Sequence, residues 1–570
     1  MKNIFIIIII SLSLFSCNDD ILDIGPTDRI AADAVWSDPS LIMAYHNTLY
    51  TGIGTGNSRN MLAKATDEMA FKPSNRYPGP NLDGTLDPDN VTSRINFGGA
   101  GSIYTWNRDF SLIRKVNVFI EQMETSDALE TSVKIRLVAE ARFIRAYMYF
   151  KLIVRYGGVP IIDEVATQNN LVDLARNTFD ECVAFIEADL DAALPDLDAA
   201  YHPGDGDFGR ATQGVCKALR SRMYLYIASP LFNTSNDVTK WQDAADAALD
   251  LIDDNTFSLH PDYSTLFNAP TGSANNEIIF ARNYTASNSH SQPMIYLGRR
   301  WGAFGGWSAN GGIAHNLVED YDMTNGEPAF LKVNHVNTTV NPASGYDPQN
   351  PYANRDPRLD KTINHDESEF RSSTLEMWLS EDVDTDNLWG FDSYRQSGDN
   401  PEAGTFIRKF VTEDESIVLD FSTPFTTPFI WFRLGEVYLN YAEAMFELGD
   451  EATCRQYINL IRARPTVDMP PIPDSVTGEE LRTRLYNERR IELALEEHRY
   501  FDVRRWEIAQ YTQAQPTTGM HIFLDQNTGV KRYETYIVFP TVWDDKLNFL
   551  PIENAEILRS NGALTQTPGY

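Results

Sequence analysis

The sequence predicts a mainly α-helical protein, in which paired helices form a scaffold that a loop-rich insertion interrupts. Apolar residues recur at helical spacing through residues 39–252 and again through residues 428–510. Between these stretches, Gly, Pro, Asn and Asp separate short apolar runs over residues 260–427, which is typical of loops and short strands. A weak internal repeat adds to the prediction, because three helical segments share the same mixture of small and aromatic residues.

The chain begins with the features of a secretory signal. Lys2 precedes an apolar run over residues 4–14, and the small Ser16 precedes Cys17. The run is too short for a membrane span, which needs about 20 apolar residues. A cysteine at this place resembles the lipid-attachment site of bacterial lipoproteins, so we expect residues 1–16 to be a signal peptide and Cys17 to carry lipid. An ordinary signal with a chance cysteine is the alternative.

Helical periodicity starts after a short tether. Residues 17–35 contain acidic side chains and a helix-breaking Gly25-Pro26 pair, which predicts an extended, lipid-bearing tether. A Gly-Gly-Val-Pro sequence at residues 157–160 then marks a strong helix end. The helices predicted for the N-terminal region, residues 36–260, cover residues 39–50, 102–123, 131–156, 178–194, 211–228 and 239–252.

The C-terminal region, residues 261–570, combines the loop-rich insertion (261–427), a second helical stretch (428–510) and a tail (511–570). Helices are predicted at 428–448, 451–464 and 478–510, and a strand at 548–551. The turn at Gly449-Asp450 makes residues 434–464 look like a tetratricopeptide-type hairpin. Such hairpins stack because one alone cannot bury its apolar face, so we expect about four helix pairs.

Composition narrows the choice of function. The net charge of -32 argues against nucleic acid as a partner, because phosphate binding requires a basic surface. Cys182, Cys216 and Cys454 are far apart and lie in helical patterns, which favours small core residues over a zinc site. The acidic run from Asp382 to Asp386 lacks the turn glycine of a calcium loop. We expect no metal and no cofactor.

The densest motif is a charged helix near the C-terminus. Glu488, Glu492 and Glu496 recur four residues apart and would line one helical face. Carboxylates at this spacing repel each other unless cations lie nearby, and the adjacent arginines at 489, 490, 499, 504 and 505 would supply them as ion-pair partners. A catalytic pair is the alternative, but the many arginines favour carboxylates that stay ionised and act structurally.

This segment, residues 488–506, resembles the C-terminal signature of the SusD/RagB family, which comprises outer-membrane lipoproteins of Bacteroidetes. Segments 140–160, 439–444 and 459–464 and the final Pro-Gly-Tyr also match family elements in the same order. The chain departs from the pattern at Pro465, where members often continue with Ala-Gly. The resemblance assigns a structural signature to Glu488, Arg489, Glu492, Glu496, Arg499, Asp502, Arg505 and Trp506.

The resemblance implies a non-catalytic protein that binds a nutrient, usually a glycan, and covers a TonB-dependent (SusC-like) transporter. It also implies a location on the outer membrane, held by the lipid anchor and facing the outside. The tetratricopeptide-like helices would contact the transporter, and the loops outside them would bind an oligosaccharide or polysaccharide.

Two loops are candidates for the ligand site. One carries Tyr296, Trp301, Phe304 and Trp307 among glycines, and we expect their rings to form a stacking platform for a sugar. The alternative is that Trp301 and Trp307 fold back onto the helical body. The second loop covers residues 67–97 and contributes Asp67, Arg76, Tyr77 and Asn96.

Two other functions stay open from the residues themselves. A surface glycoside hydrolase would share the export signal, the aromatic residues and the many carboxylates. A purely structural adaptor would contact partners only through its helical repeats. The sequence does not identify the glycan.

Overall fold

The computed structural model describes residues 32–54, 56, 61–70, 84–91, 103–165, 175–301 and 312–570. The predicted fold class is confirmed, because helices dominate and most strands are short. Within these ranges, no helix combines the length and the apolar character needed to cross a bilayer. The predicted signal peptide, Cys17 and most of the tether lie outside them.

The N-terminal helices begin and end where the sequence places its capping residues. Asp38 accepts a hydrogen bond from the Ser40 amide at 2.7 Å, and Thr178 forms a reciprocal capping box with Glu181. Gly157 ends the longest helix with a φ of 74°. These helices are α2 (Ala32–Val35), α3 (Pro39–Leu49), α5 (Trp106–Thr125), α6 (Thr131–Tyr156), α7 (Phe179–Ala193), α8 (Gln213–Ala228) and α9 (Thr239–Asp253).

The insertion consists of loops, short helices and small sheets, as predicted. Its strands pair mostly two by two, as β2 with β3, β4 with β8 and β5 with β6. Its elements are α10 (Tyr263–Asn268), β1 (Ile278–Arg282), α11 (Gln292–Tyr296), α12 (His315–Asp320), β2 (Phe330–Val333), β3 (Val336–Val340), α13 (Arg358–Thr362), β4 (Ile363–His365), β5 (Glu369–Phe370), β6 (Ser373–Thr374), β7 (Leu379–Ser380), α14 (Val383–Asp386) and β8 (Thr405–Ile407).

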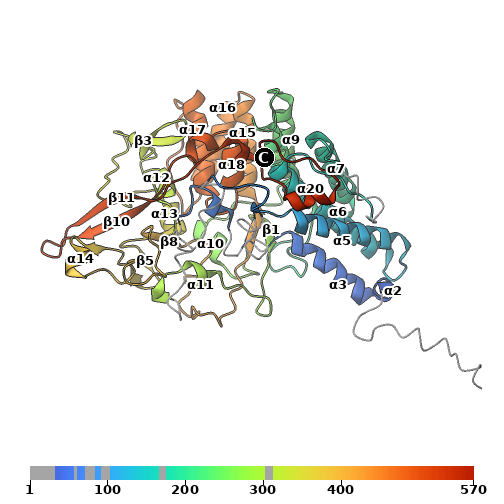
Figure 1. Cartoon of the computed structure of the whole chain (residues 1–570), viewed down its shortest axis with the longest axis horizontal. Coiled ribbons are helices and arrows are strands. Elements are labelled where there is room, and N and C mark those ends of the chain that lie inside the picture. Colours follow the sequence, from blue (N-terminus) through green and yellow to red (C-terminus); the bar gives the residue numbers. More distant parts are fainter. Residues whose placement is uncertain are drawn as a thin grey trace, which may run out of the picture.

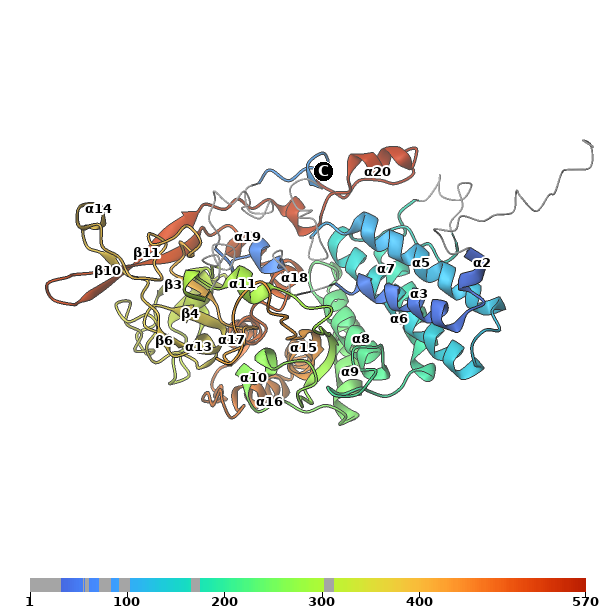
Figure 2. The same cartoon turned by 90° about the horizontal axis from the view of Figure 1, so that it is seen from below.

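The remaining elements close the chain. The predicted hairpin at residues 434–464 is present, and Gly449 makes its turn with a φ of 86°. β10 and β11 form a long antiparallel hairpin that projects from the body, as Figure 2 shows. The elements are β9 (Phe429–Arg433), α15 (Leu434–Glu447), α16 (Glu451–Arg462), α17 (Gly478–Glu492), α18 (Arg499–Arg505), α19 (Ala509–Thr512), β10 (Thr517–Leu524), β11 (Lys531–Phe539) and α20 (Asn554–Arg559).

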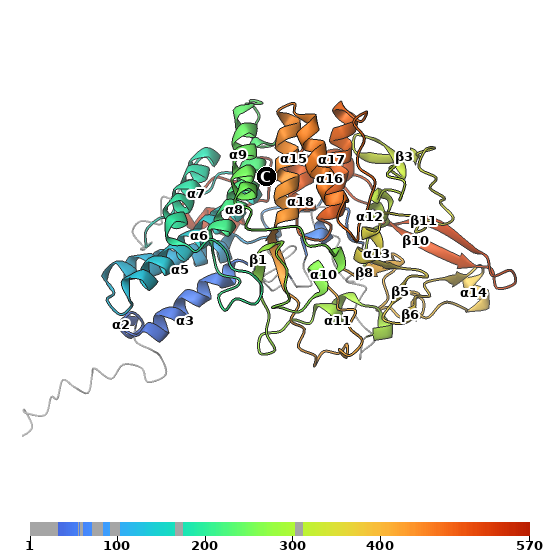
Figure 3. The same ribbon diagram turned by 180° about the vertical axis from the view of Figure 1, so that it is seen from behind.

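Helix packing gives the scaffold its tetratricopeptide-like character. α6 packs on α7, α8 on α9 and α15 on α16, and α15 also contacts α9, so that the pairs on either side of the insertion adjoin. Figure 1 places the N-terminal helices on one side and the insertion on the other, with α15, α17 and α18 between them. Figure 3 shows α9, α15, α16 and α17 side by side along one edge.

Three predicted elements differ from the structure. Phe429–Arg433 is a strand rather than the start of a helix. Its backbone pairs with β1, and this pairing buries most of its large apolar side chains. The helix predicted at 478–510 breaks after Glu492, where Leu495 and Glu497 have φ values of 65° and 72°. Residues 548–551 pair with no strand, and the Leu550 amide donates instead to the Arg155 carbonyl at 2.7 Å.

One large core connects the two predicted regions. Phe143 of α6 lies 5.7 Å from Phe280 of β1, measured between ring centroids, and Phe280 contacts Phe432 of β9. The packing therefore does not decide the boundary between residues 260 and 261, which stays a prediction. Cys182, Cys216 and Cys454 are buried, as predicted for core residues.

Candidate functional site

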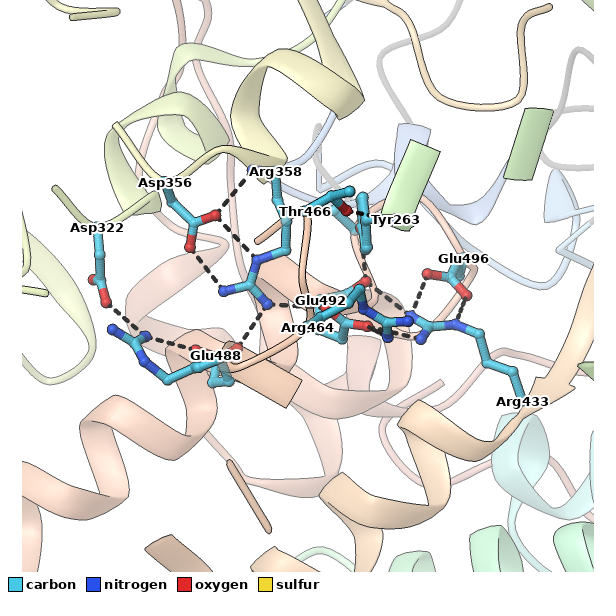
Figure 4. Close-up of polar contacts among 12 residues, drawn as sticks. Tyr263, Asp322, Asp356, Arg358, Arg433, Arg464, Thr466, Glu488, Glu492 and Glu496 are labelled. Carbon is cyan, nitrogen blue, oxygen red and sulfur yellow. Dashed lines mark hydrogen bonds and ion pairs between the residues drawn. The ribbon is translucent and has the colours of Figure 1, made fainter. Parts of the chain in front are cut away.

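A cluster of buried ion pairs surrounds Glu492, at the end of α17 (Figure 4). Its carboxylate accepts hydrogen bonds from Arg358 at 2.9 Å and Arg433 at 2.8 Å, and from Arg464 at 3.0 Å. Burial alone would raise the pKa of Glu492, but the three guanidinium groups together lower it below its ordinary value. The carboxylate is therefore held ionised and enclosed.

The other two glutamates of the motif lie in the same cluster. Glu488 pairs with Arg358 at 2.6 Å and Arg462 at 2.9 Å. Glu496 lies beyond the helix break, so it does not continue the helical face, yet it pairs with Arg433 at 2.7 Å and with Lys409 at 2.8 Å. These contacts join α17 and the residues after it to the insertion and to β9. The three glutamates therefore have a structural role.

Other residues of the signature also form buried ion pairs and hydrogen bonds. Arg489 and Arg505 both bind Asp502 at 2.9 Å, and the Trp506 indole donates to Glu443 at 2.7 Å. Arg504 differs from the predicted ion pairing, because it donates to the Leu547 carbonyl and stacks on Tyr500.

Asp67 lies at the base of the second candidate loop and is bound by protein cations. Arg499 donates to both of its carboxylate oxygens, at 2.8 and 2.9 Å, and Arg490 also pairs with it. Burial opposes ionisation, but the two arginines lower the pKa of Asp67 below its ordinary value. Its carboxylate thus anchors the segment before the loop, and this geometry gives no support to direct ligand contact. Arg76, Tyr77 and Asn96 lie outside the described residues.

The aromatic loop is described as far as Trp301. The Trp301 ring is partly buried and meets Phe370 and Phe406 edge to face, with centroids 5.0 and 6.0 Å away. It therefore packs on the insertion rather than on the helical body. Tyr296 is fully buried, because α11 turns it into the core, and so it does not stand in an exposed platform. Phe304 and Trp307 lie outside the described residues.

Backbone pairing joins described residues that flank the two candidate loops. The Ala70 amide donates to the Gly312 carbonyl at 3.0 Å, and the Ala314 amide donates to the Glu68 carbonyl at 2.9 Å. Glu68 and Ala70 thus lie side by side with Gly312 and Ala314. Gly312 permits this approach, because a Cβ there would lie 2.3 Å from the Ala70 oxygen.

Strand β8 completes this arrangement, which we call the loop junction: Ala70, Trp301, Gly312 and Phe406. Phe406 forms a β-bridge with Gly312 and also contacts the Trp301 ring. The two loops that the sequence nominated are therefore linked to one strand through their described residues Ala70, Trp301 and Gly312.

The sequence did not single out a second aromatic group near the loop junction. The His521 ring lies between those of Tyr394 and Tyr536, with centroids 5.7 and 3.7 Å away. Tyr536 donates to the Glu402 carbonyl at 2.6 Å, beside Ala403, which lies close to Gly312. Tyr394 lies far before the other two in the sequence, and His521 and Tyr536 are single residues on the paired strands of one hairpin, so no sequence pattern would have found the group.

Charged groups in the insertion are paired as well. Arg300 binds Asp392 at 2.6 Å and lies over the exposed Phe391 ring. Asp384, in the predicted acidic loop, pairs with Arg395 at 3.1 Å. Among the residues that the structure describes, no group of His, Cys, Asp and Glu is arranged to hold a metal ion.

Comparison with known families decides the relationship. The family model described as "SusD family" matches residues 276–570, more than half of the chain. The chain belongs to the SusD family. A second model, described as "Starch-binding associating with outer membrane", matches residues 38–225, so that both sides of the insertion carry family features.

Individual SusD relatives match more than half of the chain. SusD-like protein P25 of Formosa agariphila is 22% identical over 531 residues, which cover 89% of this chain and 90% of that protein. The starch-binding protein SusD of Bacteroides thetaiotaomicron is 25% identical over 60% of each chain. A solved SusD-like protein from Bacteroides fragilis has a TM-score of 0.76 and 28% identity, covering 96% of this chain and all of the other.

Proposed function

We propose that this SusD-family protein binds a glycan at the cell surface and passes it, chemically unchanged, to a TonB-dependent (SusC-like) transporter in the outer membrane. Lipid on Cys17 would hold the protein there, and the tether would link it to the scaffold. Phe304 and Trp307, together with Trp301, would form the stacking platform, while Arg76, Tyr77 and Asn96 would bind sugar hydroxyls.

The loop junction carries this proposal. It joins the start of one candidate ligand loop to the end of the other through the Ala70–Gly312 hydrogen bond of 3.0 Å. Aromatic and polar residues from both loops would then lie near one ligand, as sugar binding requires. The carboxylates of the charged helix are enclosed by arginines, which favours binding over hydrolysis.

The relatives support the same class of ligand. One is named a starch-binding protein, and a laminarin-binding SusD-like protein shares the fold with a TM-score of 0.58 over 94% of this chain. Their ligands differ, so the class of ligand carries over and the particular glycan does not.

The first test is binding of the protein without residues 1–17 to a glycan array. We expect at least one glycan to bind, and Trp301→Ala and Trp307→Ala to weaken it at least tenfold, about 1.4 kcal/mol. Trp36→Ala is the matched control, since Trp36 packs on Tyr45 and Phe119 in the N-terminal region. Absence of binding to every glycan would favour the structural adaptor instead.

A second pair of measurements separates binding from hydrolysis and tests the partner. Incubation with the bound glycan should release no new reducing ends, and their release would overturn the non-catalytic assignment. Purification of the full chain from membranes in mild detergent should retain a TonB-dependent transporter. Its loss under conditions that preserve other outer-membrane complexes would contradict the proposed delivery.

A further inference from the structure

A polar pocket of about 180 Å³ lies behind the loop junction. Five parts of the fold line it: the segment at Asp67, α12, the turn between β2 and β3 with the start of β3, α17, and the segment that leads from α19 into β10. This space is large enough to hold several water molecules. Amide, hydroxyl and charged groups line it, among them Asn316, Glu319, Asn337, Arg490, Gln515 and Thr518.

Most of the charge on its wall is already neutralised. Asp320 binds Arg490 at 2.7 Å and also pairs with Lys332. Asp67 binds Arg490 and Arg499. These pairs leave the two aspartates with no need of a ligand cation.

Glu319 is the exception on this wall. Among the described residues, no cation lies within ion-pair distance of its carboxylate, and its hydrogen bond from the Asn337 amide is long, at 3.4 Å. Burial, and next the Asp320 charge, raise the pKa of Glu319 to about 7. The buried carboxyl of Glu319 therefore has few hydrogen-bond donors around it, and a ligand hydroxyl could supply one.

The chemistry of the wall selects the ligand class. The ion pairs of Asp67 and Asp320 leave little net charge on the wall, which favours a neutral ligand over an ion. The walls also offer no broad apolar surface for an aromatic molecule. Amide and hydroxyl groups can both donate and accept, as the hydroxyls of a sugar do. We propose that this pocket binds one neutral sugar ring, with Glu319 accepting from a ring hydroxyl and Gln515 closing the open side.

The position of the pocket links it to the glycan site, and this step rests on the proposed function. Asn316 follows Ala314 by two residues, and Asp67 precedes Ala70 by three, so the pocket begins where the paired segments of the loop junction end. A glycan held on the aromatic loops could place one unit in the pocket. The loops would then bind the faces of the sugar rings, while the pocket distinguishes their hydroxyl patterns.

The test uses the full chain in detergent and a set of single sugars. Methyl glycosides of glucose, galactose and mannose, with glucuronate and glucosamine as charged probes, are titrated by saturation-transfer NMR. We expect at least one neutral glycoside to bind and both charged sugars to bind less well. Preference for glucuronate or glucosamine, or no binding of any probe, would overturn the proposal.

Variants locate the site. Glu319→Ala and Gln515→Ala should each weaken the neutral glycoside at least tenfold, and Gln515 is exposed, so its variant keeps the test valid if the other fails to fold. Glu447→Ala is the matched control, a partly buried carboxylate on α15 that pairs with Arg482 at 3.4 Å. Unchanged binding in both pocket variants would place the sugar elsewhere.

The two proposals fail separately. If array glycans bind and depend on Trp301, but Glu319→Ala and Gln515→Ala have no effect on any sugar, the pocket assignment is wrong and the glycan function stands. If no array glycan binds while a methyl glycoside binds in a Glu319-dependent manner, the pocket stands and the proposed glycan delivery fails.

Discussion

Glu492 is the carboxylate at the centre of the buried ion-pair cluster. Three guanidinium groups lie within 3.0 Å of its carboxylate, and the group is completely buried. A buried charge is stabilising only when its partners replace the water it has lost. The same arginines reach Glu488, Glu496 and Glu277, so that each carboxylate shares its cations with another.

Glu492→Gln should therefore destabilise the protein strongly, since three buried arginines lose one counterion. Breaking a buried pair typically costs about 3–5 kcal/mol, and we expect a large drop in the thermal unfolding midpoint. Glu381→Gln is the control, because its pair with Arg532 is exposed and should contribute roughly 0–1 kcal/mol. Equal midpoints for the two variants would show that the cluster is not a structural centre.

Glu497 should make the stability of the protein fall as the pH rises. Burial raises its pKa to about 8, above the ordinary value of about 4.3. The stabilisation it contributes is thus complete below about pH 4 and is lost as the pH rises through 8. Glu497→Gln imitates the protonated acid and can still accept from the Leu62 amide, which lies 2.9 Å from the carboxyl oxygens.

The unfolding midpoint of Glu497→Gln, relative to the native protein, should rise between pH 4.5 and 8 and level off above. The expected slope is at most about 1.4 kcal/mol per pH unit. Comparison of the two proteins cancels the histidines and lysines that titrate in both. A difference that is constant with pH would mean that Glu497 is not protonated in the folded state.

At the scale of elements, local signals predicted the helices and long-range contacts decided the rest. The capping box at Thr178 and the helix end at Gly157 depend only on residues close to them in the sequence, so they could be predicted. By contrast, β9 is a strand because Arg433 pairs with Ile278, about 150 residues earlier. The break after Glu492 likewise depends on Glu68, whose carboxylate accepts from the Leu495 amide at 3.1 Å. The loop junction depends on equally distant partners, so the sequence could nominate its loops but not their pairing.

Gly312→Ala tests the junction as an element. The new Cβ would lie 2.3 Å from the Ala70 carbonyl oxygen, so the two segments must separate, at a cost of about 1–3 kcal/mol for overpacking. We expect glycan affinity on the array to fall while the circular dichroism of the helices is retained. Gly206→Ala is the control, since nothing lies within 4 Å of its Cβ position. Unchanged affinity in Gly312→Ala would remove the junction from the site.

At the scale of the whole molecule, the helices and the loops divide two tasks. The helices pack along one edge, where Figure 3 shows α9, α15, α16 and α17 together. The residues of the loop junction, apart from Ala70, belong to the insertion. A ligand site carried by the insertion would leave the helical edge available to the proposed transporter. The proposed anchor at Cys17 precedes, in the sequence, the described scaffold, which starts at residue 32.

Cys17→Ser should therefore change location without changing binding. A single acyl chain gives only marginal membrane attachment, whereas two or more hold firmly, so loss of the modified cysteine should move the protein from the membrane fraction to the soluble one. Metabolic labelling with an alkyne fatty acid should mark the native protein and not the variant.

Ser11→Ala, which alters the signal segment alone, should keep both label and location. The purified Cys17→Ser protein should retain the unfolding midpoint and glycan affinity of the native chain. A variant that stays with membranes, or a native protein that takes up no label, would contradict lipid attachment at Cys17.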